Sequence, residues 1–388
     1  MNDLKQNYFD FAATGIPCEA ILQAALLEST NNFGNPSSAH SLGKTAKQIL
    51  ENAREKIAST FAVENETIYF TSGGTESNQL VLLSLLSRPQ KGSVLISSIE
   101  HPAVREQAKA LQLAGWHVDE IPVTSDGFVD ECALSKKITN DLALVCVMLV
   151  NNETGAVQNI LKIKNTIKTF SKRDVHFHVD AVQGLGKIPF TLSDLQIDSA
   201  AFSAHKIGGA RGSGLLYLRK PLQSFLRGGG QEKNMRSGTE NIFGAISFAS
   251  CIEKYHISEK NKIAEERFLL QKKLTHNFAE KLLTIKTCEL IPKTRMENEE
   301  HFSPWILQAS FKNIPGQVMV RALDANGFYI STGSACSSAK ASRPILEAMN
   351  VPKDVRETSV RFSFGFSTSE DAMNNLFDAV KKITDDFR

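Results

Sequence analysis

"SAAFSAHKIGGARGSG" (199–214) places Lys206 between an apolar run and a cluster of four glycines. Apolar residues return at 215–218, so the stretch is typical of two buried strands joined by a turn. A single lysine is most often an exposed surface charge. Lys206 would have a chemical role only if neighbouring strands brought partners to it.

Short apolar runs alternate with helical patterns over much of the chain. They predict strands at 67–71, 94–98, 117–122, 142–150, 175–179, 199–203 and 214–218. The spacing between them predicts helices at 75–87, 103–114 and 160–172. Strands that alternate with crossover helices indicate an α/β fold, with a mostly parallel sheet and helices on both faces.

The composition changes near residue 255. Residues 255–286 are rich in Lys, Glu, Leu and His and predict one or two solvent-facing helices. Further strands are expected at 306–311 and 360–364, and further helices at 315–325 and 370–386. We therefore predict a large α/β domain (15–254), a smaller α+β domain (255–388), and an N-terminal segment (1–14) that packs with the small domain.

The bulk composition narrows the class of protein. The chain has 388 residues, 42% of them hydrophobic, and a net charge of +2, which gives no basic footprint for nucleic acid. The longest apolar run has nine residues (142–150), about half of what a membrane span needs. The six cysteines form no C-x-x-C pair and the first residues do not resemble a secretory signal. We expect a cytoplasmic protein without a metal site, and no direct contact with membrane or nucleic acid.

The first polar strand end is a candidate phosphate site. In "FTSGGTESNQ" (70–79), Gly74 and Thr75 join a strand to a helix, and the backbone N–H groups of a helix start attract anions. The same residues also suit a tight turn with Thr75 as N-cap. The stretch matches neither the Walker nor the G-x-G-x-x-G pattern, which disfavours ATP and NAD.

Other strand ends carry further reactive groups. His101 precedes a proline at a helix start, Asn152 follows the strand at 142–150, and Asp180 ends the strand at 175–179. Each alone suits a cap or a turn. Together with Lys206 they meet the requirements of pyridoxal phosphate (PLP), namely an amine for the aldehyde, an anchor for the phosphate and an acid for the ring nitrogen.

The chain resembles cysteine desulfurases of the NifS/IscS type, within the class V aminotransferases and the fold-type I PLP-dependent enzymes. The resemblance covers nearly the whole chain and is collinear. It rests on the motifs NPSSAH (35–40), TSGGTESN (71–78), EHPAV (100–104), NNETG (151–155), HVDAVQGLGKIP (178–189), SAHK (203–206), GGGQEKNMRSGTEN (228–241), STGSACSSA (331–339) and RFSFG (361–365). Any one motif could occur by chance, but all of them in this order are specific.

The resemblance implies a role for each cofactor residue. Lys206 would bond the PLP aldehyde, Asp180 would pair with the ring nitrogen, and His101 would stack on the ring and move protons. Gln183 and Asn152 would hold the ring hydroxyl. The phosphate ligands would be Gly74, Thr75, Ser203 and His205, with Thr239 reaching the phosphate of a neighbouring subunit in a homodimer with shared active sites.

The resemblance also implies the substrate and the reaction. Arg361 would grip the carboxylate of L-cysteine, with Asn152 and Asn35 also near the substrate, and the freed Lys206 amine would remove the Cα proton. Cys336 would attack the substrate sulfur, which leaves L-alanine and a Cys336 persulfide. The persulfide would pass to a protein acceptor, either an iron–sulfur scaffold or a tRNA-thiolation carrier.

Four residues depart from the family pattern, and other functions stay open. Phe11, Gly208, Ala210 and Phe366 stand where relatives carry different residue types, which leaves rate and acceptor preference open. Rival functions are a selenocysteine lyase, a class V aminotransferase without sulfur transfer, and a non-catalytic scaffold with the same fold. Intact Lys206, Asp180 and His101 disfavour the scaffold.

Overall fold

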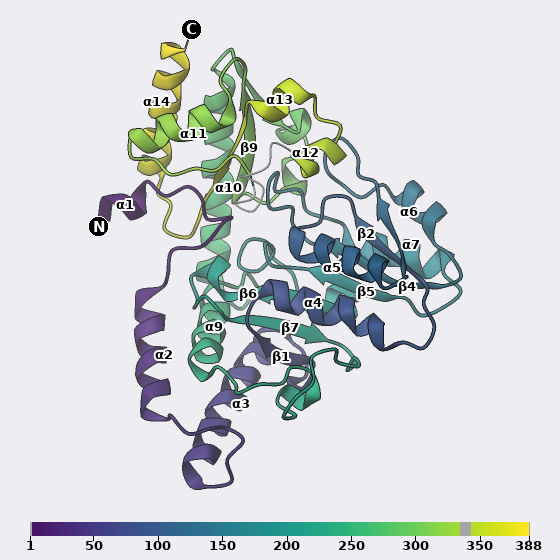
Figure 1. The fold of residues 1–388 in the computed structure, drawn as a ribbon. Coiled ribbons are helices and arrows are strands. Elements are labelled where there is room, and N and C mark those ends of the chain that lie inside the picture. Colours follow the sequence, from purple (N-terminus) through teal and green to yellow (C-terminus); the bar gives the residue numbers. More distant parts are fainter. Residues whose placement is uncertain (1, 334–342, 388) are drawn as a thin grey trace.

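The computed structural model describes residues 2–333 and 343–387 (Figure 1). A seven-stranded sheet forms its larger part, in the order β1-β7-β6-β5-β4-β2-β3. Its strands are β1 (Ile68–Thr71), β2 (Ser93–Ser97), β3 (His117–Ile121), β4 (Leu142–Met148), β5 (His176–Asp180), β6 (Ser199–Ser203) and β7 (Gly214–Leu218). All seven match predicted strands, with ends shifted by at most two residues. Only β7 runs antiparallel to its neighbours, so the predicted mostly parallel α/β sheet is confirmed.

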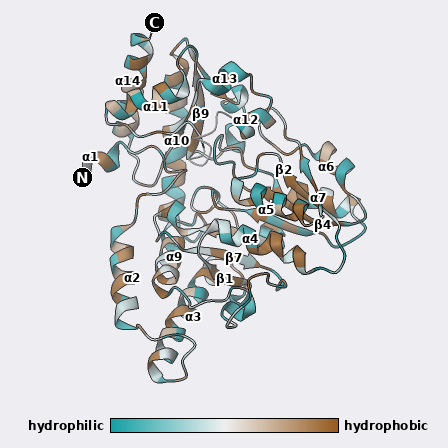
Figure 2. Ribbon diagram, in the orientation of Figure 1, coloured by the Kyte–Doolittle hydropathy of each residue, from teal (hydrophilic) through white to brown (hydrophobic). Residues whose placement is uncertain are grey.

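Helices cover both faces of this sheet, which explains its continuous apolar strands. One face packs against α4 (Gly74–Ser84) and α5 (Pro102–Leu113), and the other against α3 (Ser41–Phe61), α7 (Ile160–Phe170) and α9 (Ile242–Tyr255). Successive residues of β4 alternate between the two cores: Leu144 and Cys146 face α4 and α5, while Val145 and Val147 face the opposite side. Strands β2 and β4 are accordingly mostly brown in Figure 2.

Several helices and one strand of the structure are absent from the prediction. They are α1 (Asn2–Gln6), α2 (Glu19–Asn31), α3, α6 (Glu131–Lys137), α8 (Leu192–Leu195), α9, β8 (Cys288–Ile291), α12 (Pro344–Ala348) and α13 (Lys353–Glu357). Within α2 only Ala25 is fully buried, while Leu26 and Leu27 are exposed, so its apolar residues form no inward-facing stripe.

A second, antiparallel sheet lies toward the C-terminus, in the order β10-β9-β8. It contains β9 (Ile306–Phe311) and β10 (Ser359–Ser363), both predicted, and packs with α10 (Lys262–Leu283), α11 (Gly316–Ala325) and α14 (Glu370–Asp386). The predicted helical region at 255–286 is one long helix, α10. The division at residue 254 stays a prediction; α9 ends at Tyr255 and α10 begins at Lys262.

The N-terminal segment runs along the second sheet before it reaches the first. The Phe9 N–H donates to the Tyr329 carbonyl (2.8 Å), and the Ser363 N–H donates to the Phe9 carbonyl (2.8 Å). Six residues later, the Gly15 N–H donates to the His205 carbonyl (2.7 Å) beside Lys206. Residues 10–14 therefore lie between the two sheets. Among the described residues, no helix has the length and apolar character that crossing a membrane requires.

Candidate active site

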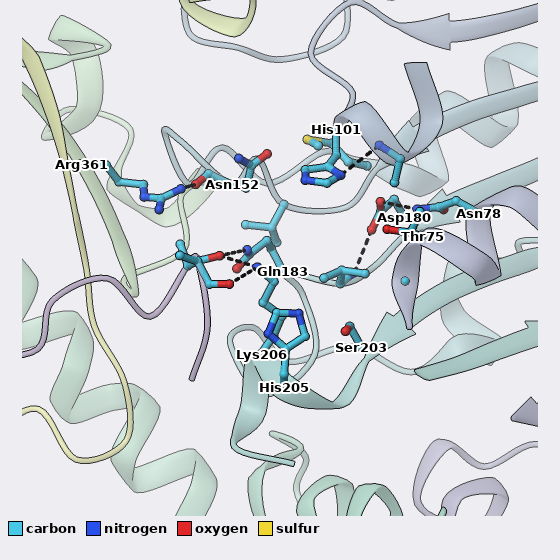
Figure 3. A pocket seen from close by; sticks show the side chains of 17 residues that line it. Thr75, Asn78, His101, Asn152, Asp180, Gln183, Ser203, His205, Lys206 and Arg361 are labelled. Carbon is cyan, nitrogen blue, oxygen red and sulfur yellow. Dashed lines mark hydrogen bonds between the residues drawn. The ribbon is translucent and has the colours of Figure 1, made fainter. Parts of the chain in front are cut away.

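A cavity of about 250 Å³ opens where the loops after β1, β2, β4, β5 and β6 meet residues 12–13 and β10 (Figure 3). The carboxyl ends of parallel strands are where open α/β sheets bind ligands. Ten predicted site residues line this cavity. They are Gly74, Thr75, His101, Asn152, Asp180, Gln183, Ser203, His205, Lys206 and Arg361.

Three other predicted residues are not among those that line the cavity. Cys336 lies outside the described residues. Thr239 is exposed, as a residue reserved for a second subunit would be. Asn35 is also exposed, and its Oδ1 accepts a hydrogen bond from the Ser37 N–H (2.9 Å). The Asn-Pro-Ser-Ser stretch forms a turn before α3. Asn35 is therefore not among the residues that line the cavity of this subunit, and its contact with the substrate stays a prediction.

Asp180 ends β5 as a buried carboxylate held by neutral donors. Its Oδ2 accepts from Asn78 Nδ2 (2.8 Å) and its Oδ1 accepts from the Val182 N–H (3.1 Å). Asn78 also lines the cavity, one helical turn beyond Thr75 on α4. It was missed by the prediction, although it belongs to the quoted TSGGTESN motif and its i+3 spacing from Thr75 places both on one helix face.

Lys206 points into the cavity from the short helix after β6. Its Nζ donates to the carbonyls of Ala12 (2.6 Å) and Ala13 (2.7 Å), and Gln183 Nε2 donates to the same Ala12 carbonyl (2.8 Å) (Figure 3). Backbone oxygens of the N-terminal segment therefore complete the surroundings of the amine. A sequence pattern cannot reveal such contacts, because they involve no particular side chain.

His101 caps α5 and is half-buried at the cavity wall. Its Nδ1 accepts from the Ala103 N–H (3.1 Å), which leaves the proton of a neutral imidazole on Nε2. Burial holds the pKa of His101 below its ordinary value of 6.5; the Asp180 carboxylate opposes this effect and the Lys206 cation adds to it. The ring is therefore neutral near pH 7, as a proton carrier and a stacking surface would require.

One end of the cavity contains the start of α4 together with Ser203 and His205, the predicted phosphate ligands. Burial, and then the positive charge of Lys206, lower the pKa of His205 to about 4. The His205 ring is thus neutral, and its Nδ1 lies 3.1 Å from Thr14 Oγ1. A Cβ added to Gly74 would lie 2.6 Å from Val182 Cγ2, so only glycine leaves this helix start open.

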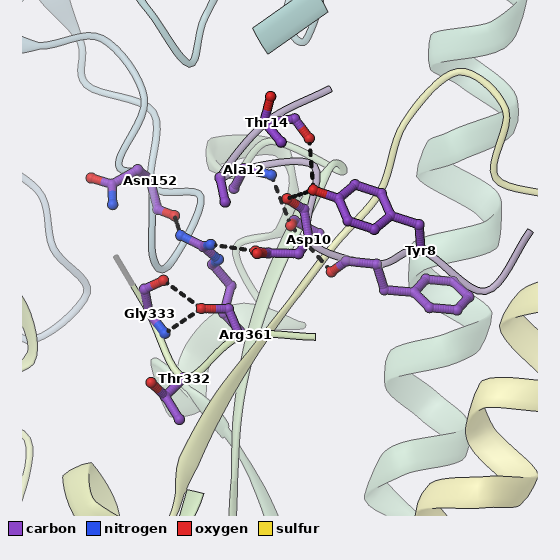
Figure 4. A network of polar contacts seen from close by, with 12 residues as sticks. Tyr8, Asp10, Ala12, Thr14, Asn152, Thr332, Gly333 and Arg361 are labelled. Atoms are coloured by element: carbon purple, nitrogen blue, oxygen red, sulfur yellow. Dashed lines mark hydrogen bonds and ion pairs between the residues drawn. The ribbon is translucent and has the colours of Figure 1, made fainter. Parts of the chain in front are cut away.

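Arg361 lies at the other end of the cavity, fully buried on β10 (Figure 4). Its Nη1 donates to the Asn152 carbonyl (2.8 Å) and its Nη2 to Asp10 Oδ1 (2.7 Å). Arg361 Nε and Asn152 Oδ1 are buried and have no partner within residues 2–333 and 343–387. An orphaned donor and an orphaned acceptor at the same end suit a ligand with both a carboxylate and an amine.

The segments that flank 334–342 are anchored next to Arg361. Ser331 forms a backbone bridge with Arg361, and its hydroxyl bonds both the carbonyl (2.7 Å) and the N–H (3.2 Å) of Gly333. On the other side, Arg343 Nη2 donates to the Ser359 carbonyl (3.0 Å), at the start of β10. The described residues on either side of 334–342 therefore lie near Arg361.

Three of the four family departures line a second cavity of about 160 Å³ that also borders Lys206. Phe11 and Phe366 form part of its aromatic wall, with Trp305 stacked on Phe366. Gly208 has a φ of +81°, and a Cβ there would lie 2.8 Å from the Ile16 carbonyl, which explains the glycine. Ala210 is buried, and nothing in the structure explains it.

The family described as Aminotransferase class-V matches residues 7–376. A cysteine desulfurase IscS of Dictyoglomus turgidum is 34% identical over 389 residues, which cover 99% of this chain and 96% of the relative. A cysteine desulfurase IscS of Methanosarcina thermophila is 35% identical over 99% of this chain and 93% of its own.

Solved structures agree with these relatives. A NifS-like protein superposes with a TM-score of 0.87 at 32% identity and covers 98% of this chain and 99% of its own. A structure described as SspA in complex with cysteine has a TM-score of 0.79 at 26% identity, over 94% of this chain and 100% of its own.

Proposed function

The chain belongs to the class V aminotransferase family, and on that premise we propose that it is a cysteine desulfurase, which converts L-cysteine to L-alanine and a protein-bound persulfide. Curated cysteine desulfurases align with 99% of the chain. The observation that carries the proposal is the cavity in which Lys206, Asp180, His101 and Arg361 meet. A scaffold without activity would have no reason to keep an amine, an acid, a neutral imidazole and a buried guanidinium in one cavity.

The residues present fit PLP as the cofactor. Asp180 is buried, and among the described residues it forms no salt bridge, so a protonated ring nitrogen would supply its missing cation. The α4 N-terminus with Thr75, Ser203 and His205 would hold the phosphate, and Gln183 the ring hydroxyl. When bound, PLP supplies an electron sink for negative charge at the substrate Cα.

The side chains of this protein would place the substrate and move its protons. Arg361 would hold the carboxylate of L-cysteine at the end of the cavity opposite Asp180, and the substrate amine would replace the Lys206 amine on the cofactor. The unpartnered Asn152 Oδ1 would accept a hydrogen bond from the ring hydroxyl or from the substrate. The Lys206 amine, once released from the cofactor, would take the Cα proton. His101, neutral with its proton on Nε2, would present a donor rather than a second charge.

Cys336 would accept the sulfur. Its thiolate would attack the substrate sulfur, so that a sulfur–sulfur bond forms while the bond between Cβ and sulfur breaks. The electron pair of the broken bond would stay on the three-carbon product, which would take up a proton and leave as L-alanine. The described residues on either side of 334–342 lie near Arg361 and support this role. The persulfide would then pass to a protein acceptor for iron–sulfur cluster assembly or for tRNA thiolation.

The test compares the purified wild type with variants in which a single cysteine is replaced, and measures absorbance and product release. The wild type is expected to carry visible PLP absorbance and to release L-alanine and sulfide from L-cysteine with a reductant. Cys336→Ala should keep the absorbance and lose sulfide release, whereas Cys132→Ala, at an exposed free cysteine, should keep both. Native sulfide release from Cys336→Ala would contradict the role of Cys336, and activity on L-selenocysteine alone would identify a selenocysteine lyase.

A further inference from the structure

Four polar side chains behind Asp180 have no part in the proposed reaction, yet they form a continuous chain of hydrogen bonds. His176 Nε2 lies 2.7 Å from Ser199 Oγ, which lies 2.7 Å from His178 Nδ1. His178 Nε2 lies 2.8 Å from Asn78 Oδ1, and Asn78 Nδ2 donates to Asp180 Oδ2 at 2.8 Å. The chain thus links half-buried His176 to the carboxylate in the cavity.

The strand geometry of the sheet produces this alignment. His176, His178 and Asp180 alternate along β5 and therefore project to the same face. Ser199 is the register partner of His178 on the adjacent strand β6, and Asn78 approaches from α4 on that face. Apart from Asp180, these residues carry no role in the predicted site, because two histidines and a serine in strands suit an ordinary core.

In each hydrogen bond between His176 and Asp180, chemistry decides which group donates and which accepts. An ionised carboxylate only accepts, so Asn78 must turn its amide nitrogen to Asp180 and its oxygen to His178. His178 then carries its proton on Nε2, and its bare Nδ1 accepts from the Ser199 hydroxyl. The Ser199 oxygen in turn accepts from His176 Nε2–H. All four donors therefore point toward Asp180.

The series of hydrogen bonds requires that the rings of His176 and His178 are both neutral, and they are. Burial, with a contribution from His176, lowers the pKa of fully buried His178 to about 3. Burial lowers the pKa of His176 to about 4; Asp198 opposes this effect, while Arg88, Lys164 and Arg219 add to it. A doubly protonated His178 would lose the acceptor that Ser199 needs.

We propose that Asn78, His178, Ser199 and His176 are positioning residues that fix Asp180 as an anion facing the cavity. In this position the carboxylate would accept a hydrogen bond from the protonated ring nitrogen of PLP. The proposal rests on the function proposed above for its cofactor. Neutral donors stabilise the carboxylate by hydrogen bonds without cancelling its charge. An arginine or lysine in the same place would compete with the ring for the carboxylate.

The first test measures the cofactor in variants of the full chain. His178→Phe removes the hydrogen bonds to Ser199 and Asn78, so the amide of Asn78 is no longer held toward Asp180. The apparent Kd for PLP is expected to rise by roughly threefold to tenfold, the range for a lost hydrogen bond between neutral groups. His178→Gln retains one donor and one acceptor and should recover part of the affinity. The matched control is His256→Phe, because His256 is equally buried but packs against Phe61 and Phe190, away from Asp180; its Kd should change less than about twofold.

A spectroscopic signature separates positioning from general loss of packing. The ring nitrogen of ¹⁵N-labelled PLP should give the signal of a protonated pyridine in the wild type and in His256→Phe, and should shift toward the unprotonated value in His178→Phe. Equal Kd values and equal ring signals in His178→Phe and wild type would overturn the proposal.

The second test needs no cofactor. In the ¹⁵N-histidine NMR spectrum, the signals of His176 and His178, assigned from the His176→Gln and His178→Gln variants, should show neutral rings protonated at Nε2 from pH 5 to 8. A proton on Nδ1 of His178, or titration of His178 near pH 6.5, would overturn the proposal. If the wild type bound no PLP, the proposed function would fail, and the NMR result would still show whether the directed chain exists.

Discussion

At the residue scale, the guanidinium of Arg361 has both protein partners and a predicted substrate partner. Two of its nitrogens already bond Asn152 and Asp10, so a substrate carboxylate must share a guanidinium that has one acidic neighbour. These two bonds leave Arg361 Nε without a partner among the described residues. The guanidinium is held in place by them and by strand β10. Substrate binding at this end should therefore depend on the planar fork of arginine and not only on its charge.

Arg361→Lys tests this dependence. Lysine keeps the positive charge but cannot bond Asn152, Asp10 and a carboxylate at once, so KM for L-cysteine should rise by roughly tenfold to a hundredfold, equivalent to about 1.5–3 kcal/mol. Steady-state kinetics measure the change. Arg356→Lys, in a salt bridge with Glu347 away from the cavity, should leave KM unaltered. An unchanged KM in Arg361→Lys would exclude a bidentate role.

Glu100 offers a pH test at the same scale. Burial raises its pKa to about 8 from an ordinary value of 4.5; Ser97 opposes this effect, while the Asp180 carboxylate adds to it. The folded protein therefore keeps a proton that the unfolded chain has released. This group makes the free energy of unfolding fall as pH rises from about 4.5 to about 8, with no further change above that range.

Glu100→Gln removes the titration while it keeps a polar side chain of the same shape for the Ser97 hydroxyl and the Met148 N–H. Denaturant unfolding at pH 5, 6.5 and 8 should show a smaller loss of stability for this variant than for the wild type. The exposed Glu106→Gln variant should follow the wild type. Parallel pH profiles for Glu100→Gln and wild type would show that Glu100 is ionised in the folded protein.

At the element scale, the turn after Lys206 explains one departure from the family. Gly208 and Gly212 both have left-handed backbone angles, with φ of +81° and +73°. Only Gly208 is also crowded, since an added Cβ would meet the Ile16 carbonyl, whereas Gly212 faces open space. Gly208→Ala should therefore destabilise the protein by about 1–3 kcal/mol, and Gly212→Ala by less. Urea unfolding measures the difference; equal losses would show that strain alone, without crowding, makes glycine necessary.

Most elements that the sequence predicts have an apolar pattern, although α3 has one too and is absent from the prediction. Strands β2, β4 and β7 are largely apolar because they are buried, whereas in the edge strand β3 only Ile121 is fully buried. In α10 and α14 the buried residues recur at helical spacing. The pattern fails for α2, whose leucines are exposed, and for β8, where Cys288 and Glu289 are only half-buried.

In the site, the motifs identify side chains such as Lys206 but not the Ala12 and Ala13 carbonyls or the role of His176. Those depend on pairings that no local sequence specifies.

At the scale of the whole molecule, exposed apolar residues indicate a partner surface. Leu26 and Leu27 on α2 and Phe33 after it are more than half exposed, in a part of the chain that extends away from both sheets (Figure 1). Thr239, the predicted phosphate ligand of a neighbouring subunit, is exposed as well. Water contact with such a patch is unfavourable, so we propose that the protein forms a homodimer and that this patch lies in its interface.

Leu27→Glu should weaken that dimer. A carboxylate at a position that the second subunit covers would lose its hydration, so the mass in light scattering should fall from twice 42.7 kDa toward 42.7 kDa on dilution. Because Thr239 would then be withdrawn from the neighbouring site, PLP should also be lost faster. Leu113→Glu is the matched control, since Leu113 is even more exposed, at 91%, and belongs to α5, a helix that lies apart from α2 in Figure 1. If Leu27→Glu stayed dimeric at the concentrations where the wild type does, α2 would lie outside the interface. If it became monomeric but kept PLP as the wild type does, each subunit would hold its phosphate without Thr239.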